Sequence, residues 1–188
     1  MSLRFDRLLS IYFFSHVAKL TQGRELRIPI LMYHSISRDS EDGVHPYYRT
    51  CTSPEVFEMH MKLLRDYNYK IISLSDAVNL FNDMAEQPLA QSQTDRVRYV
   101  VITFDDGFRD FYTNAFPILE KYGFTATMFL STGFINNGSR FKGGKCLSWD
   151  EVRELHNKGI EFGSHTVTHP QLKTLNKKQI EYEVRKSK

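Results

Sequence analysis

Residues 97–107 read VRYVVITFDDG, and this stretch decides the fold. Apart from one arginine, every residue of 97–104 is β-branched or aromatic, a composition that favours a β-strand and is the strongest strand signal in the chain. The run leads directly into Asp105, Asp106 and Gly107. The sequence therefore predicts a buried strand that ends in two adjacent acids.

The residues after this strand predict a helix and then a second strand. Apolar side chains recur at helical spacing over residues 111–122, with a kink or a new turn expected at Pro117 and an end at Gly123. Residues 124–130 (FTATMFL) have strand character. Three further elements are expected: a helix begun by the capping box of Ser148 and Glu151, a strand over residues 160–163, and a last helix begun by Asn176 and Gln179.

The residues before the strand at 97–104 predict two more pairs, each made of a strand and a helix. Residues 28–34 (IPILMYH) form a short apolar run, which favours a strand buried on both faces. Ser53 and Pro54 suit the N-cap and first position of a helix, whereas residues 69–74 favour a strand followed by a helix that Ser75 caps. Five residues recur at helical spacing and indicate the amphipathic face of the first helix: Val56, His60, Leu63, Leu64 and Tyr67.

Repeated strand and helix units with short links predict an α/β fold. Such units form a mainly parallel sheet with helices outside, either open or closed into a (β/α) barrel. In both architectures functional residues gather at the carboxyl ends of the strands. The two acids and a pair of histidines, His165 and His169, follow predicted strands and are expected at those ends.

Composition indicates one globular domain. The chain has 188 residues, 41% of them hydrophobic, and a formal net charge of +3 with basic residues spread along its length, so nucleic acid is not an expected partner. Cys51 and Cys146 lie far apart and outside any CxxC pattern, so neither a disulfide framework nor a thiolate zinc site is indicated.

The first 24 residues are expected to form a helical extension, with the main domain over residues 25–188. Residues 8–14 (LLSIYFF) are too short to span a bilayer and no small-residue cleavage site follows, so an amphipathic helix is favoured over a signal peptide or firm membrane anchor. A cytoplasmic location is predicted, with export or the cell envelope as the alternative. Residues 86–96 are polar and glutamine-rich, which predicts a flexible surface insertion.

The acids and histidines together suggest a metal site. One helix cap cannot use both carboxylates, and two like charges at the end of an apolar strand are costly unless a cation or proton compensates. His165 and His169 are four residues apart, which places both imidazoles on one side of either a helix or an extended segment. A nearby carboxylate would complete a two-histidine, one-carboxylate set that suits a divalent metal: zinc most of all, with cobalt or nickel possible.

Two segments resemble the first two motifs of the polysaccharide deacetylase family, also known as the NodB homology domain of carbohydrate esterases. They are residues 103–107 (TFDDG) and 164–170 (SHTVTHP), and further resemblance lies in residues 30–35, 45–54 and 126–130. The resemblance covers the chain from about residue 29 onward and implies a distorted (β/α) barrel of the polysaccharide deacetylase type.

The resemblance also implies a function and roles for individual residues. Asp106, His165 and His169 would bind the metal, and Asp105 would be the catalytic base of a metal-dependent hydrolase that removes N-acetyl groups from a glycan. His34 and Arg109 are candidates to contact the site from outside the ligand set, Arg109 by pairing with Asp105 or Asp110. The oligomeric state is not predicted.

The chain departs from the family in its length. The later motifs, including the histidine that would act as general acid, should follow His169, but only 19 residues remain. The domain is therefore expected to be incomplete at its C-terminus and inactive alone. The alternative function is a catalytically inactive domain that binds glycan or another partner.

Overall fold

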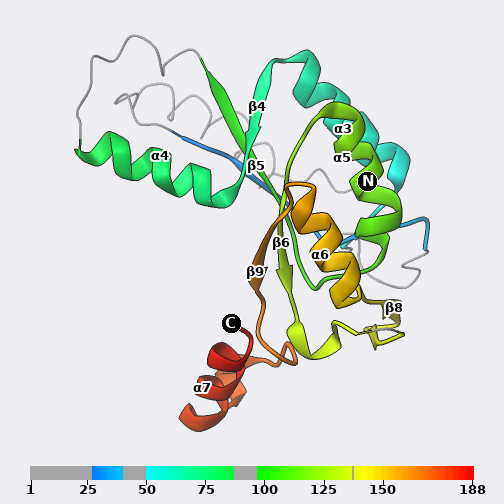
Figure 1. Cartoon of the computed structure of the whole chain (residues 1–188), viewed down its shortest axis with the longest axis vertical. Helices are drawn as coiled ribbons and strands as arrows, with labels where there is room; N and C mark the ends of the chain where they lie inside the picture. The colour runs from blue at the N-terminus through cyan, green and yellow to red at the C-terminus, as the bar shows by residue number, and fades with distance from the viewer. Residues whose placement is uncertain (1–26, 40–49, 87–96, 137) are drawn as a thin grey trace, which may run out of the picture.

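The computed structural model describes residues 27–39, 50–86, 97–136 and 138–188, with the side chains of residues 84–86 excepted (Figure 1). The expected N-terminal helical extension, residues 1–24, lies outside the described residues, as do residues 87–96 of the predicted insertion. Within the described ranges, no helix has both the length and the apolar character needed to cross a membrane.

The strands are β1 (Ile30–Tyr33), β2 (Ser35–Ile36), β3 (Cys51–Thr52), β4 (Tyr69–Ile72), β5 (Arg98–Phe104), β6 (Thr127–Leu130), β7 (Arg140–Phe141), β8 (Gly144–Lys145) and β9 (Glu161–Ser164). The α-helices are α3 (Pro54–Asp66), α4 (Leu74–Glu86), α5 (Phe116–Tyr122), α6 (Trp149–Asn157) and α7 (Lys177–Lys186). Short helical turns are the π-helix η4 (Phe111–Ala115) and the 3₁₀ segments η5 (Thr132–Phe134) and η6 (Leu172–Thr174).

The main sheet is parallel and is centred on β5. The strand order is β1-β5-β6-β9, and β4 also pairs with β5. Val101 is paired with both Ile30 and Ile72, so β1 occupies one edge of β5, while β4 and β6 follow one another along the other edge. Among the described residues the sheet is not closed, because β1 and β9 each pair with one strand only. The predicted α/β architecture is confirmed.

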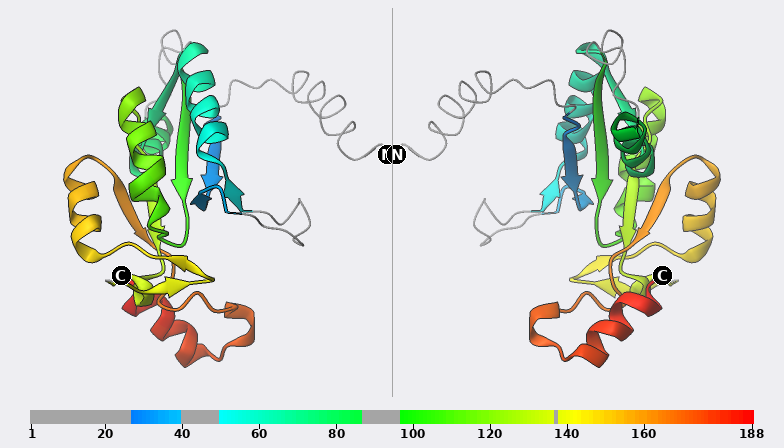
Figure 2. Two further views of the ribbon diagram at one scale, coloured as in Figure 1. Left: turned by 90° about the vertical axis from the view of Figure 1, so that its right-hand side faces the viewer. Right: turned by 90° about the vertical axis from the view of Figure 1, so that its left-hand side faces the viewer.

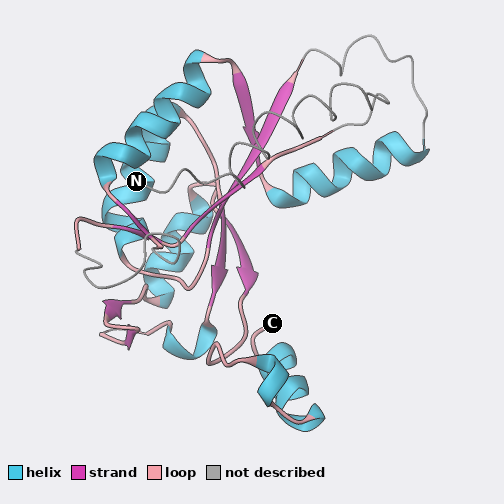
Figure 3. Cartoon of the chain, turned by 180° about the vertical axis from the view of Figure 1, so that it is seen from behind, coloured by secondary structure: helices cyan, strands magenta, loops and turns pink. Residues whose placement is uncertain are grey.

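The two faces of β5 pack into different clusters because successive side chains of a strand point to opposite sides. Val100, Ile102 and Phe104 belong to the large core cluster, which includes residues of α3, α5 and α6. Val101 packs instead with Ile72 and Ala77 in a smaller cluster beside α4. Accordingly, α3, α5 and α6 lie on one side of the sheet and α4 on the other (Figures 1 and 3).

Several local predictions agree with the structure. Ser53 caps α3, and the capping boxes of α6 and α7 are both formed. The predicted break near Pro117 is the change from the π-helix η4 to α5, and Gly123 ends α5 with a φ of 66°. These features depend on side chains within a few residues of one another, so local sequence is enough to predict them.

Three local predictions were wrong. In β1, Ile30 and Met32 are 54% and 62% exposed, because this edge strand has cover on one face only within the described residues. The buried residues of α3 are Phe57 and Met61, one position on from the predicted face, whereas Val56, Leu63 and Tyr67 are exposed. Helix α4 is capped by Ser73 rather than Ser75, whose hydroxyl bonds Glu161 of β9.

We expect Phe104→Ala to lower the free energy of unfolding by about 3–5 kcal/mol, because Phe104 is fully buried, stacks on Tyr33 and makes edge-to-face contacts with Phe57 and Phe111. Urea unfolding followed by circular dichroism measures this change. Phe81→Ala on α4 is the matched control, since Phe81 is 45% exposed and its loss should cost less than about 1 kcal/mol. Equal losses in the two variants would contradict the assignment of β5 to the core.

Candidate metal centre

Asp106 lies at a tight turn where the chain leaves β5. Asp106 and Gly107 both have positive φ values, 74° and 80°, so two successive left-handed residues turn the backbone away from the strand. A side chain at Gly107 would begin 2.8 Å from Ile135 Cδ1 and 3.0 Å from Leu130 Cδ2, so the turn requires glycine both for its backbone conformation and for space. The Asp106 side chain is consequently buried, at 1% exposure.

His165 and His169 lie on the irregular segment that follows β9. The His165 N–H donates to the carbonyl of Leu130 at 2.8 Å, which continues the pairing of β9 with β6 by one residue. Thr166 and His169 then adopt left-handed conformations, with φ values of 67° and 55°. The two histidines therefore lie on neither a helix nor an extended segment, the two alternatives that their spacing left open. The His169 N–H donates to Thr166 Oγ1 at 3.0 Å and closes the turn.

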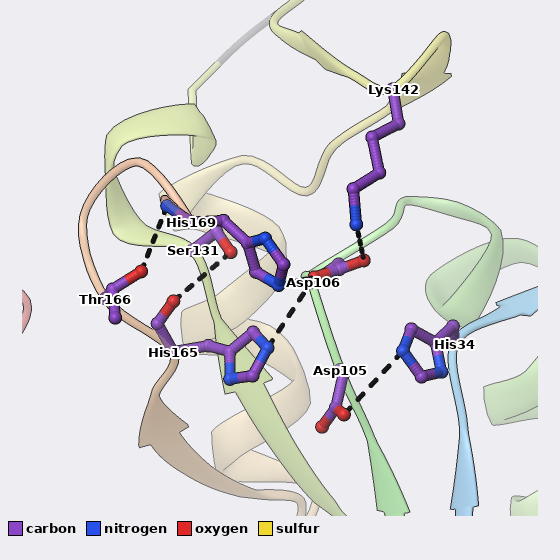
Figure 4. Close-up of polar contacts among 8 residues, drawn as sticks. All are labelled: His34, Asp105, Asp106, Ser131, Lys142, His165, Thr166 and His169. Carbon is purple, nitrogen blue, oxygen red and sulfur yellow. Dashed lines mark hydrogen bonds and ion pairs between the residues drawn. The ribbon is translucent and has the colours of Figure 1, made fainter. Parts of the chain in front are cut away.

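The three side chains converge at the carboxyl ends of the strands (Figure 4). His169 Nε2 lies 3.3 Å and His165 Nε2 3.8 Å from Asp106 Oδ1, and the two imidazole centroids are 4.8 Å apart. One donor atom from each residue lies within 4.8 Å of the other two. Asp106 Oδ1 is buried and lacks a hydrogen-bond partner among the described residues. Two imidazoles around an unpartnered carboxylate oxygen fit a divalent cation.

Asp105 lies beside this group but is not part of it. Its N–H donates to the carbonyl of Tyr33 at 3.0 Å, which aligns the ends of β5 and β1. His34 Nε2 is 3.8 Å from Asp105 Oδ2, and both side chains are mostly buried. The adjacent carboxylates of Asp105 and Asp106 therefore face different neighbours, His34 for the first and the histidine pair for the second (Figure 4).

Arg109 does not approach the site in the way that the sequence suggested. Its Nε donates to Glu151 Oε1 of α6 at 2.7 Å, and its side chain is 45% exposed. Asp110 instead accepts a hydrogen bond of 2.5 Å from the Ser35 hydroxyl. The predicted pairing of Arg109 with Asp105 or Asp110 was wrong, because the capping box of α6 brings an acid within its reach.

Lys142 is a neighbour of the site that the sequence analysis did not identify. It lies at the turn of the β7–β8 hairpin, and its Nζ is 3.4 Å from Asp106 Oδ2. The preceding Phe141 places its ring 5.3 Å from that of His169. The hairpin and α7 both lie beyond the carboxyl ends of the sheet strands (Figure 2). Only the glycine pair at residues 143–144 marked a turn here in the sequence, and it does not reveal which part of the fold the hairpin packs against.

Cys146 follows the same hairpin and is buried. Burial, and then the negative charge of Asp106, raise the pKa of the Cys146 thiol to about 11. The thiol therefore stays protonated at neutral pH in the metal-free chain, and it lies outside the group of donor atoms that come within 4.8 Å of one another. This leaves the carboxylate and the two imidazoles as the donor set among the described residues.

Comparison with known proteins identifies the family. Residues 92–188, just over half of the chain, match the family model described as polysaccharide deacetylase. The chain therefore belongs to the polysaccharide deacetylase family. It is 33% identical over 162 residues to the Bacillus subtilis (strain 168) protein named "Putative polysaccharide deacetylase YxkH", a match that covers 86% of this chain and 50% of that protein.

A second relative is the poly-beta-1,6-N-acetyl-D-glucosamine N-deacetylase of Staphylococcus aureus (strain MRSA252). It is 30% identical over 129 residues, which cover 68% of this chain and 41% of the relative. The chain thus spans about half the length, or somewhat less, of these curated relatives.

Solved structures share the fold. The Streptococcus pyogenes deacetylase PplD in complex with acetate has a TM-score of 0.70 and 30% identity, over 87% of this chain and 66% of that structure. BC0361, a polysaccharide deacetylase from Bacillus cereus, has a TM-score of 0.61 and 26% identity, over 86% and 48%. The fold is therefore of the predicted type, the distorted (β/α) barrel of the polysaccharide deacetylases, with a sheet that is not closed among the described residues.

We expect Asp106→Asn to raise the free energy of unfolding of the metal-free chain by about 1 kcal/mol. The change removes a buried charge that has an unpartnered oxygen, and asparagine tolerates a positive φ at least as well as aspartate. Thermal and urea unfolding in the presence of a chelator provide the measurement. Asp150→Asn at an exposed site is the control, and a less stable Asp106→Asn protein would contradict the expectation.

Proposed function

We propose that this chain carries the metal-binding part of an enzyme that removes N-acetyl groups from a polysaccharide. The observation that carries the proposal is the convergence of Asp106, His165 and His169 at the carboxyl ends of the sheet, with a second carboxylate on the adjacent residue. The family match supports the reaction class. The name of the S. aureus relative specifies an N-acetylated glucosamine polymer, which supports a glycan of this chemistry as the substrate.

The proposed ligands are Asp106, His165 and His169, and the proposed cation is zinc, with cobalt or nickel as alternatives. Two neutral imidazoles and one carboxylate leave coordination positions open, as catalytic zinc sites require. The buried oxygen of Asp106 that lacks a hydrogen-bond partner supports this assignment, because burying a carboxylate is costly unless its charge is compensated. Once bound, the cation would polarise the acetamide carbonyl and lower the pKa of the attacking water.

We assign the role of general base to Asp105. Its carboxylate is next in sequence to a metal ligand but lies outside the donor group, so it is free to remove the proton of the attacking water. His34, 3.8 Å from Asp105 Oδ2, is placed to orient that carboxylate. Hydrolysis then yields acetate and a free amine on the sugar, and the amine must gain a proton as it leaves.

We expect the 188-residue chain to bind one equivalent of zinc, and His165→Ala or His169→Ala to weaken binding at least about tenfold, because two remaining ligands chelate poorly. Isothermal titration with zinc measures the affinity. His156→Ala on α6 is the control, since this exposed histidine lies outside the donor group. Unchanged affinity in both ligand variants would eliminate the proposed site.

In a version of the protein that extends to the length of its relatives, we expect Asp105→Asn to retain zinc and to lose roughly a hundredfold or more in turnover, since it removes the base. Acetate release from an N-acetylglucosamine oligomer is the measurement, and Asp76→Asn on α4 is the control.

Two outcomes would change this proposal. Loss of zinc together with activity in Asp105→Asn would show that the roles of Asp105 and Asp106 are reversed. Oligomer binding that survives chelation, without acetate release by the unchanged extended protein, would support an inactive glycan-binding domain instead.

A further inference from the structure

The C-terminal part of α7 is attached to the domain through polar side chains. Glu183 and Ser187 are each only 6% exposed, whereas the apolar residues on either side of Glu183, Tyr182 and Val184, are 54% and 44% exposed. A surface helix ordinarily buries its apolar face and leaves charged residues in water. A buried glutamate in such a position requires specific hydrogen-bond partners.

Those partners belong to the segment between the two histidines. The Val167 N–H and the Thr168 N–H both donate to Glu183 Oε2 at 2.8 Å, and the Thr168 hydroxyl donates to Oε1 at 2.7 Å. One carboxylate therefore accepts three hydrogen bonds from two consecutive residues. Ser187, one helical turn later, is hydrogen-bonded to Ser164, the residue that immediately precedes His165.

The same segment is held on its other side by the chain that follows β6. The Thr132 N–H donates to the Thr166 carbonyl at 3.1 Å, and the Gly133 N–H donates to the Val167 carbonyl at 2.8 Å. The chain after β6 thus binds the carbonyl groups of Thr166 and Val167 through residues 132–133, and Glu183 binds the N–H groups of Val167 and Thr168.

This segment needs such support because its backbone conformation is unfavourable. Thr166 is β-branched and has a φ of 67°, and His169 has a φ of 55°. Residues in left-handed conformations persist where the surroundings determine them, and they relax when those contacts are lost. Relaxation at Thr166 or His169 would change the direction of the His169 side chain, because the rotation occurs in the backbone that carries it.

We propose that Glu183 is a positioning residue for the metal site: its carboxylate fixes residues 167–168 so that His165 and His169 meet Asp106. The inference rests on the proposed metal site and adds a residue to it. Glu183 does not contact the metal ligands' side chains in this scheme, and acts through the backbone of the loop that carries them. The requirement is for hydrogen-bond acceptors in that position, and a glutamine, whose carbonyl oxygen accepts both N–H groups, should meet most of it.

The test is isothermal titration of the 188-residue chain with zinc, at a temperature where chelator-treated unfolding curves show every variant folded. Glu183→Ala should weaken zinc binding on the order of tenfold or more, as is typical for residues that orient metal ligands. Glu183→Gln should stay within about threefold of the unchanged chain, because the geometry of the acceptor is kept. Glu181→Ala, two residues earlier on the same helix, removes an exposed glutamate paired with Arg185 and should leave zinc affinity unchanged.

The outcomes separate this inference from the proposed function. If the unchanged chain fails to bind zinc, the metal site and this inference both fall. If it binds and Glu183→Ala binds equally well, the inference alone falls, and Glu183 then serves only the stability of α7. Should Glu183→Ala not fold, Glu183→Asp decides: it keeps the charge but withdraws the carboxylate by one methylene from the Val167 and Thr168 N–H groups, and zinc affinity equal to that of the unchanged chain would overturn the inference.

Discussion

The buried carboxylate of Asp106 is the constraint on which the rest of the site depends. A carboxylate that is 1% exposed loses its hydration, and the loss is costly unless cations or donors surround it. The described structure supplies two imidazoles, the Lys142 ammonium 3.4 Å from Oδ2, and a position between the donor atoms that suits a cation. The burial results from the apolar strand β5 together with the left-handed turn after it, which place Asp106 directly beyond the packed core.

The site is also where the backbone departs furthest from regular geometry. Five non-glycine residues in the described ranges have positive φ, and four of them belong to this region: Asp106, Lys142, Thr166 and His169. Such conformations are unfavourable locally and are maintained by surrounding contacts. Here those contacts are polar and come from three directions, namely the turn after β6, the β7–β8 hairpin and α7. The apolar core on one side of the sheet thus supports a polar network at the carboxyl ends of the strands.

The features that could be predicted from the sequence are those that depend on neighbours along the chain. The strand β5, the capping boxes of α6 and α7, and the break near Pro117 all follow from patterns a few residues long. The candidate ligands could be identified because two adjacent aspartates after an apolar strand are costly without a compensating charge. The two histidines four residues apart were recognised as a chelating pair. Their assignment as ligands stays a prediction.

The features that could not be predicted depend on contacts between distant segments. Arg109 pairs with Glu151, 42 residues away, and Glu183 bonds Thr168 across 15 residues, and neither pair has a local signature. The buried face of α3 was misplaced by one position, because both Val56 and Phe57 begin apolar series at helical spacing. The series that begins at Phe57 is the buried one, because Phe57 packs against the ring of Phe104 on β5.

The donors of the proposed metal site come from the ends of two strands, β5 and β9, that are separated by β6. Residues after β6 donate hydrogen bonds to carbonyl groups of the segment that carries the histidines. The ends of the three adjacent strands β5, β6 and β9 therefore all contribute to the proposed site. All of these contacts lie within the described residues, as does the support from α7. Metal binding and its dependence on Glu183 can therefore be measured by titration without any substrate, because the ligands and their support belong to the same described region.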